Sequence, residues 1–336
     1  MRTLLLALAL VATTVGLARA ATGSFAVAAA VPVGKHPAGV AVADGMLWVT
    51  NDVDNTVSRI DLTTDRVTAT VPLGGKGYPD PALTATSEGT LWVAAPSTGT
   101  ISRIDTQTGK VTAKLTVPTR VDGVSVVGDS LWITSFDPYR CSSNRCFSRL
   151  TRISTLSASV TGKFSIASPV GITFGFGSLW IVNHREMTVT RFNPATGKVV
   201  KKLRVRIRNA GTFEGPEQVA AGLASVWVSQ PAQNIVTRID PRSDRITARI
   251  KFPRSATPFT FAIGARSLWV LGPKSVFRVD PRTNRITDSA RIGKHAGSDY
   301  RGLRSIAVVD HSLWVTDGDA DTVDRIDIDQ TLGSRR

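Results

Sequence analysis

The chain has 336 residues, of which 42% are hydrophobic and 20% charged, a composition typical of globular proteins that excludes disordered, collagenous and coiled-coil chains. Lysine and arginine together number 41 against 26 aspartates and glutamates, which gives a formal net charge of +15. Such a basic balance favours nucleic acid, anionic cell wall or an acidic ligand as partners.

Residues 1–20 have the pattern of a secretory signal peptide. Arg2 gives a positive start, a mostly apolar run follows, and a small-x-small tripeptide ends at Ala20. The apolar run is shorter than the about 20 residues that span a bilayer. We therefore predict a single domain over residues 21–336 that is secreted or periplasmic, monomeric and without a membrane span.

Seven tryptophans divide the rest of the chain into repeats of 40 to 48 residues. Each tryptophan lies in an apolar triplet, and a second apolar segment with alternating polarity precedes it, which predicts two short buried strands. The tryptophans are Trp48, Trp92, Trp132, Trp180, Trp227, Trp269 and Trp314. Self-similarity at such a period is typical of repeat architectures.

Two further strands are predicted in each repeat. Eleven residues after most of the tryptophans, an arginine, an apolar residue and an acid form a third strand, as in Arg238-Ile239-Asp240. The fifth residue of the following turn is of a type that accepts positive φ, as a type I turn with a bulge requires. These turn residues are Asp65, Gly109, Gly197, Asp244 and Asn284. The fourth strand is more polar, which suits an exposed outer edge.

The third repeat differs because its third-strand arginine, Arg152, follows the tryptophan by twenty residues instead of eleven. The nine inserted residues lengthen the connection between its second and third strands and hold the two cysteines, Cys141 and Cys146. Export favours disulfide formation, so we predict that these cysteines pair with each other.

Four antiparallel strands repeated seven times predict an all-β fold, the seven-bladed β-propeller, because each sheet buries both faces only between neighbours around a ring. The last repeat stops near residue 329 without a fourth strand, whereas residues 25–34 have the pattern of one. We expect this N-terminal strand to be the outer strand of the seventh blade and to close the ring.

The repeated elements resemble those of a known family. Leu-Trp-Val-x-Asn, as in residues 47–51, and Ser-Arg-Ile-Asp-x-x-Thr-x-x-Val, as in residues 58–67, are similar to the secreted bacterial propellers with a Tyr-Val-Thr-Asn repeat and to the streptogramin B (virginiamycin B) lyase-like propellers. The resemblance covers nearly the whole mature chain and implies the propeller fold. Lyases of this family hold magnesium through glutamates and carry a Glu-x-His element. The sequence has no Glu-x-His, so no lyase site is carried over.

Binding residues are expected around the central channel, where the connections from fourth to first and from second to third strand emerge. Positions there that vary between repeats are the candidates. They are Asn51, Asp122, Asn183, Glu217, Arg304 and Asp317. Asp122, Glu217 and Asp317 offer the oxygen ligands that Ca²⁺ or Mg²⁺ prefers, and Arg304 is an alternative neutralising charge. A hydrated channel mouth with scattered polar side chains is the simpler interpretation, and we favour it.

His36 and His184 lie on the same connections, where an acid such as Asp80 or Asp122 could make either a general base. Exposed loop histidines are the favoured interpretation, because the spacing lacks metal-ligand regularity. The recurring tryptophans are expected in the core. The recurring third-strand arginines are expected in structural ion pairs or turn braces rather than on nucleic acid.

Two functions remain open. The first is a non-catalytic propeller that binds a small molecule or a cell-envelope component at its channel face, and the lack of phosphate-loop and nucleophile-elbow motifs favours it. The alternative is a metal-dependent lyase or lactone-opening hydrolase, in which a cation polarises a carbonyl and a rim histidine or acid moves the proton.

Overall fold

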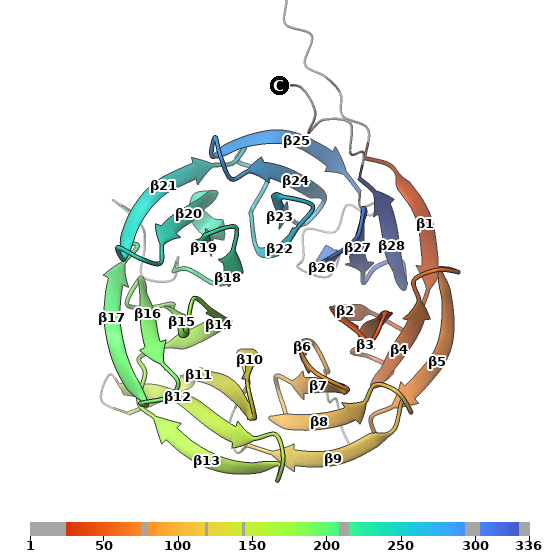
Figure 1. Ribbon diagram of the computed structural model, residues 1–336, viewed down its shortest axis with the longest axis horizontal. Coiled ribbons are helices and arrows are strands. Elements are labelled where there is room, and N and C mark those ends of the chain that lie inside the picture. The colour runs from red at the N-terminus through yellow and green to blue at the C-terminus, as the bar shows by residue number, and fades with distance from the viewer. Residues whose placement is uncertain are drawn as a thin grey trace, which may run out of the picture.

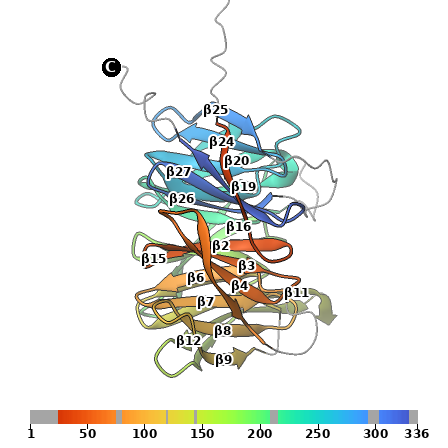
Figure 2. The ribbon, with the colours of Figure 1, turned by 90° about the vertical axis from the view of Figure 1, so that its right-hand side faces the viewer.

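The computed structural model describes residues 25–74, 80–117, 120–142, 145–207, 215–292 and 303–328. These residues form seven four-stranded antiparallel sheets that surround a central axis as blades, so the fold is a seven-bladed β-propeller (Figure 1). Figure 2 shows the ring from its edge. The predicted signal peptide, residues 1–20, lies outside the described residues. In the described part of the chain, no helix is long and apolar enough to cross a membrane.

In blades 1 to 6 the strands run in chain order from the central axis outward (Figure 1). Blade 1 has β2 (Pro37–Ala43), β3 (Met46–Asn51), β4 (Thr56–Asp61) and β5 (Arg66–Pro72); blade 2 has β6 (Leu83–Ser87), β7 (Thr90–Ala95), β8 (Thr100–Asp105) and β9 (Val111–Thr116); blade 3 has β10 (Gly123–Val127), β11 (Ser130–Ser142), β12 (Arg145–Ser154) and β13 (Ser159–Phe164). Blade 4 has β14 (Pro169–Gly175), β15 (Ser178–Asn183), β16 (Thr188–Asn193) and β17 (Lys198–Arg204); blade 5 has β18 (Val219–Gly222), β19 (Ser225–Gln230), β20 (Ile235–Asp240) and β21 (Arg245–Lys251); blade 6 has β22 (Thr260–Gly264), β23 (Ser267–Leu271), β24 (Ser275–Asp280) and β25 (Arg285–Arg291). A short 3₁₀ helix, η1 (Pro231–Gln233), links β19 to β20.

Blade 7 combines the two ends of the described chain. Its inner strands are β26 (Leu303–Val309), β27 (Ser312–Asp317) and β28 (Thr322–Asp327), and its outer strand is β1 (Val27–Pro32), which pairs antiparallel with β28. Just before β1, Phe25 packs edge-on against Trp269 of blade 6 with ring centroids 5.3 Å apart. Segments at opposite ends of the sequence therefore share one sheet.

Among the described residues, the core consists of seven apolar clusters, each between two neighbouring blades. The cluster between blades 1 and 2 is typical, with Trp48 of β3 packed against Leu91 and Val93 of β7. The seven tryptophans occupy equivalent places and are almost completely buried, as the repeat pattern predicts. Each sheet thus buries both faces against its neighbours, which is the physical reason that a closed ring is stable.

The turns between third and fourth strands have the predicted left-handed residue. Asp65, Gly109, Gly197, Asp244 and Asn284 all have φ between 54° and 69°. A register shift follows the third-strand arginine in the pairing with the fourth strand, as between Arg238 and Ile239. Both features confirm the bulged hairpin expected from the sequence.

The insertion in blade 3 extends the β11–β12 hairpin beyond the length seen in the other blades. The backbone of Cys141 pairs with that of Cys146 across this hairpin. The side chains of both cysteines lie outside the described part of the chain, so their disulfide stays a prediction.

Candidate functional site

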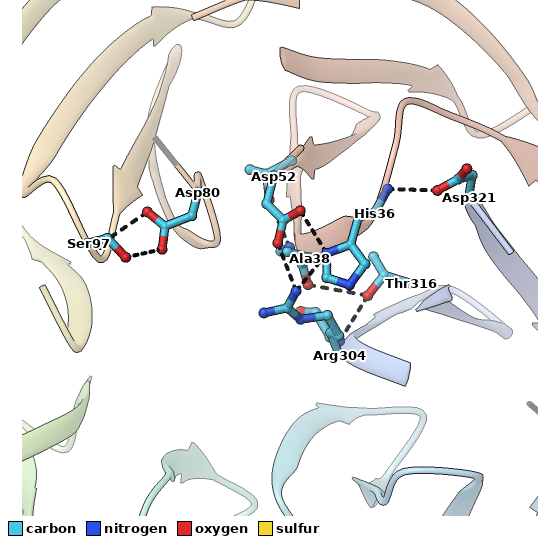
Figure 3. A network of polar contacts seen from close by, with 11 residues as sticks. His36, Ala38, Asp52, Asp80, Ser97, Arg304, Thr316 and Asp321 are labelled. Atoms are coloured by element: carbon cyan, nitrogen blue, oxygen red, sulfur yellow. Dashed lines mark hydrogen bonds and ion pairs between the residues drawn. The ribbon is translucent and has the colours of Figure 1, made fainter. Parts of the chain in front are cut away.

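A polar cluster joins blades 7 and 1 at the channel face, where loops and strand ends surround the axis (Figure 3). Its centre is the carboxylate of Asp52, which follows β3. The imidazole Nδ1 of His36, on the loop between β1 and β2, lies 2.7 Å from Asp52 Oδ1. The guanidinium Nη1 of Arg304, at the start of β26, donates to Asp52 Oδ2 at 2.8 Å. The carboxylate therefore binds two groups that come from different blades.

The position of His36 is fixed by its backbone as well as its ring. Its N–H donates to Asp321 Oδ1 at 2.7 Å, and its carbonyl accepts from the N–H of Asp52 at 3.2 Å (Figure 3). The residue has a φ of 55°, a left-handed conformation that is uncommon for residues other than glycine, although histidine adopts it more often than most, and that persists when surrounding contacts hold it. These contacts aim the ring at Asp52.

The hydrogen bonds assign the histidine tautomer. Because Asp52 accepts at Nδ1, that nitrogen carries a proton, and the 3.0 Å approach of Arg304 Nη1 to Nδ1 is a contact between two donors. His36 Nε2 is buried and has no hydrogen-bond partner among the described residues. When the ring is neutral, Nε2 is an acceptor, so His36 can take a proton or a hydrogen bond there.

The next blade adds a second carboxyl group to this face. Asp80, before β6, accepts from the Ser97 hydroxyl at 2.6 Å and from the Ser97 N–H at 3.1 Å (Figure 3). Burial raises the pKa of Asp80 above its usual range, and the charge of Asp52 contributes to the rise. Asp80 therefore lies close enough to Asp52 to be affected by its charge across the boundary between blades 1 and 2.

A second group of polar residues lies between blades 4 and 5. Burial raises the pKa of Glu217, before β18, while the neighbouring His184 lowers it in part. His184 Nδ1 lies 3.3 Å from the carbonyl oxygen of Pro216. Both histidines proposed from the sequence therefore lie beside an acid on the channel face, but in separate places.

The side chains of two predicted binding residues form hydrogen bonds inside their own blades. Asn51 donates to Thr56 Oγ1 at 2.9 Å, and Asn183 accepts from the Thr190 hydroxyl at 2.6 Å. Both amides are almost completely buried. They brace the end of the second strand, and they do not reach the His36–Asp52–Arg304 cluster.

The carboxyl groups proposed as metal ligands are also engaged separately. Asp122 pairs with Arg120 Nε at 2.7 Å and accepts from the N–H of Phe136 at 2.6 Å, and burial raises its pKa. Asp317 accepts from the N–H of Asp319 at 3.1 Å. Among the described residues, no three His, Cys, Asp or Glu side chains are placed to hold a metal ion. These residues therefore do not fit a shared Ca²⁺ or Mg²⁺ site with Glu217.

The sequence pattern predicts Arg304 and His36 at the channel face but does not single out Asp52, the residue that contacts both. The sequence does contain a pattern that points to Asp52. The residue four positions after each tryptophan varies between blades, and it is Asp52 in blade 1, Phe136 in blade 3 and His184 in blade 4. In blades 1 and 4 the position three residues after the tryptophan is buried within the blade, so the next residue is the one that reaches the channel face.

Comparisons with known proteins agree on the architecture. Residues 11–126 match a family described as a repeat of unknown function (DUF6923). No curated protein matches the sequence. Among solved structures, virginiamycin B lyase from Staphylococcus aureus is similar with a TM-score of 0.72 at 20% identity, covering 88% of this chain and 96% of that one.

Proteins with other descriptions are about as similar in structure. Kuenenia stuttgartiensis hydrazine synthase matches with a TM-score of 0.70 at 13% identity, covering 87% of this chain and 96% of that one. The Myceliophteria thermophila Cps50 (Swd1) β-propeller domain matches with a TM-score of 0.72 at 11% identity, covering 91% of this chain and all of that one. At such identities the likeness shows the propeller fold, which hosts many functions.

Proposed function

We propose that the protein is an exported propeller that binds a small polar ligand, a component of the cell envelope, at the channel face beside His36, Asp52 and Arg304. The observation that carries this proposal is the crossing of Arg304 from blade 7 to the His36–Asp52 pair of blade 1. Residues this far apart in the chain share one cluster only because the ring is closed.

The cluster offers both kinds of hydrogen-bonding group to a ligand. The contacts of Arg304 within the described residues all use Nη1, so its Nε and Nη2 groups are donors for a ligand carbonyl or carboxylate. The Asp80 carboxyl group supplies an acceptor or, when it is protonated, a second donor, whereas His36 Nε2 is buried and the ring serves to orient Asp52. A ligand with one acceptor and one hydroxyl or amine would match this arrangement.

The test uses thermal denaturation with defined envelope components. N-acetylglucosamine and D-alanyl-D-alanine are the probes, and at least one should raise the Tm of the wild type, because binding to the folded state alone stabilises it. Asp52→Asn and Arg304→Met should abolish that rise while the variants remain folded. Asp240→Asn, on the opposite face, is the matched control and should respond like the wild type. Absence of a response in the wild type, or an unchanged response in both site variants, would refute the proposal.

The alternative function is a lyase or lactone-opening hydrolase. A histidine oriented by an acid, as His36 is by Asp52, is the arrangement of a general base, but its unpaired Nε2 is buried, so a substrate would reach it only after the ring turns outward. One solved structure similar to this chain is a catalytically inactive variant of virginiamycin B lyase with quinupristin, at 19% identity. The metal ligands expected for such a reaction do not converge here, as described above, so the binding function is the better supported.

Quinupristin separates the two functions. We expect neither a change in its chromatographic retention nor a gain of water in its mass when it is incubated with the purified protein and Mg²⁺. A lyase would open the ring to an isomer of equal mass, whereas a hydrolase would add water, so liquid chromatography with tandem mass spectrometry is needed to detect both. Ring opening that is lost in His36→Gln would establish the enzyme and overturn the non-catalytic proposal.

A further inference from the structure

The outer strands of two adjacent blades carry more cations than the other outer strands. β17 has the sequence Lys-Val-Val-Lys-Lys-Leu-Arg and β21 has Arg-Ile-Thr-Ala-Arg-Ile-Lys, so together they carry seven cations and no acid. By contrast, β5 and β9 carry one cation each and β1 carries none. β17 and β21 are neighbours on the circumference of the ring (Figure 1).

Strand register places these cations in matching positions. Lys202 and Arg204 pair with the third strand of blade 4 opposite Thr190 and Thr188, while Arg249 and Lys251 pair equivalently in blade 5. In each blade the two cations are two residues apart, so they project to the same side of the strand about 7 Å apart along it. We call these four residues the basic strip.

The same two positions extend the strip into neighbouring blades. The position of Lys202 is occupied by Lys114 in blade 2 and Lys163 in blade 3, while that of Arg204 is occupied by Arg291 in blade 6. In blade 1 both positions are uncharged, with Thr70 and Pro72. The cations therefore follow an arc along one side of the ring and are densest in blades 4 and 5.

These side chains are not used by the fold. Lys202, Arg204, Arg249 and Lys251 are exposed, and among the described residues none of them forms an ion pair. Between them only Leu203 and Ile250 turn inward to the core. Four like charges in two neighbouring edges repel one another, and a bound polyanion would remove that cost.

We propose that the basic strip binds a linear phosphate-bearing polymer of the cell envelope, such as a chain of glycerol phosphate units. The arc of cations matches an extended polyanion rather than a compact anion, because successive charges lie on successive blades. β17 and β21 carry no aromatic side chain, so the strip lacks the stacking surfaces that single-stranded nucleic acids use. The predicted export of the chain makes an envelope polymer the matching source of phosphate.

The experiment measures affinity for poly(glycerol phosphate) as a function of NaCl concentration. The variant Lys202→Gln/Arg204→Gln/Arg249→Gln/Lys251→Gln should bind at least tenfold more weakly than the wild type at low salt. The slope of log affinity against log salt should become shallower by about 3, since each lost phosphate contact of a flexible polyanion contributes about 0.7.

The matched control removes the same net charge elsewhere. Arg66→Gln/Lys110→Gln/Arg266→Gln/Arg282→Gln changes four exposed cations outside the strip and should alter the affinity less than threefold. Circular dichroism and the Tm establish that both variants are folded.

Three results would overturn the proposal. The first is a wild type that does not bind the polymer, and the second is a control variant that loses as much affinity as the strip variant. The third is equal or tighter binding of an oligothymidylate with the same number of phosphates, which would assign the surface to nucleic acid instead.

Discussion

The turns between third and fourth strands repeat the same side-chain contacts from blade to blade, whereas the loops of the channel face carry different side chains at equivalent positions. In the turns, one contact recurs: Asp61, Asp240 and Asp280 each accept a backbone N–H two residues later in the same turn. Hydrogen bonds to the turn lower the pKa of Asp61 and Asp240. These acids therefore brace the turns that follow the third strands.

The channel face repeats a backbone conformation but varies the side chains. Twelve residues before their tryptophans, His36, Asp80, Ser168 and Thr257 all have φ between 33° and 55°. The ring of His36 contacts Asp52, the carboxyl of Asp80 binds Ser97, and the hydroxyl of Ser168 donates to Glu186. Positions that keep one contact in several blades stabilise the blades, whereas positions that change their chemistry are free to form a site.

The third-strand arginines show how the repeated face joins the blades. Arg238 stacks over Trp227 at 5.0 Å and donates to Asn284 Oδ1 of the next blade at 2.8 Å. Arg191 makes the equivalent contact with Asp244 at 3.0 Å, and Arg325 reaches Asp65 across the junction of blades 7 and 1 at 3.1 Å. In these contacts the arginine pairs with the turn of the neighbouring blade, and Arg325 also pairs with the acid two residues away, with Nη1 3.3 Å from Asp327 Oδ1.

The largest effect on stability is expected at blade 7, whose outer strand β1 comes from the other end of the chain. Deleting residues 24–33 removes β1 and leaves β28 with an unpaired edge, so soluble folding should be lost. Val31→Asp places a charge at a buried position of β1 and should greatly lower the Tm, whereas Ala30→Asp, at an exposed position of the same strand, should change it little. A deleted protein with the Tm of the wild type would contradict closure by β1.

A smaller effect is expected from one contact between blades. Arg238→Gln removes the stacking on Trp227 and the bond to Asn284, so it should lower the free energy of unfolding by about 2 kcal/mol. Urea denaturation measures this change. Arg242→Gln, in an exposed part of the following turn, is the control and should stay within about 0.5 kcal/mol of the wild type. Equal effects of the two variants would show that the contact between blades contributes nothing.

Neutralising an acid should change the Tm in opposite directions on the two faces of the ring, as Asp240 in a turn and Glu217 at the channel face illustrate. Hydrogen bonds lower the pKa of Asp240, so its carboxylate stabilises the fold above the pKa of the unfolded chain, and Asp240→Asn should lower the Tm at pH 7. Burial raises the pKa of Glu217, so its charge is unfavourable at pH 7 and Glu217→Gln should raise the Tm.

Both differences should shrink as the pH falls, because each wild-type acid then becomes protonated. For Glu217 the change occurs from its raised pKa downward, and for Asp240 it occurs at lower pH. Thermal denaturation between pH 3 and 7 measures both. A Glu217→Gln variant less stable than the wild type at pH 7 would show that the buried charge is compensated.

The smallest effect concerns the hairpin that only blade 3 extends. Unreduced protein should contain no free thiol, and Cys141→Ser should lower stability by at most a few kcal/mol, because a disulfide between Cys141 and Cys146 closes a short loop. Thiol labelling with and without reductant measures the first point. Labelling of both cysteines in the absence of reductant would exclude the disulfide.

The sequence by itself determined the blades. The spacing of the tryptophans, the alternation of the strands and the turn residues that accept positive φ are local patterns, and each is repeated often enough to be recognised. Local backbone geometry and burial explain all three, so the number of blades and the turn at Asp65 or Asn284 could be predicted.

Only the tertiary structure decided which side chains meet at the channel. Asp52 and Arg304 lie 252 residues apart in the chain, and no local pattern links them. They meet because the ring brings the first and last repeats together. Likewise, Asn51 and Asp52 are adjacent in the chain, but the side chain of Asn51 is buried in its blade and that of Asp52 lies in the cluster. Successive side chains of a strand point to opposite faces, which explains the difference.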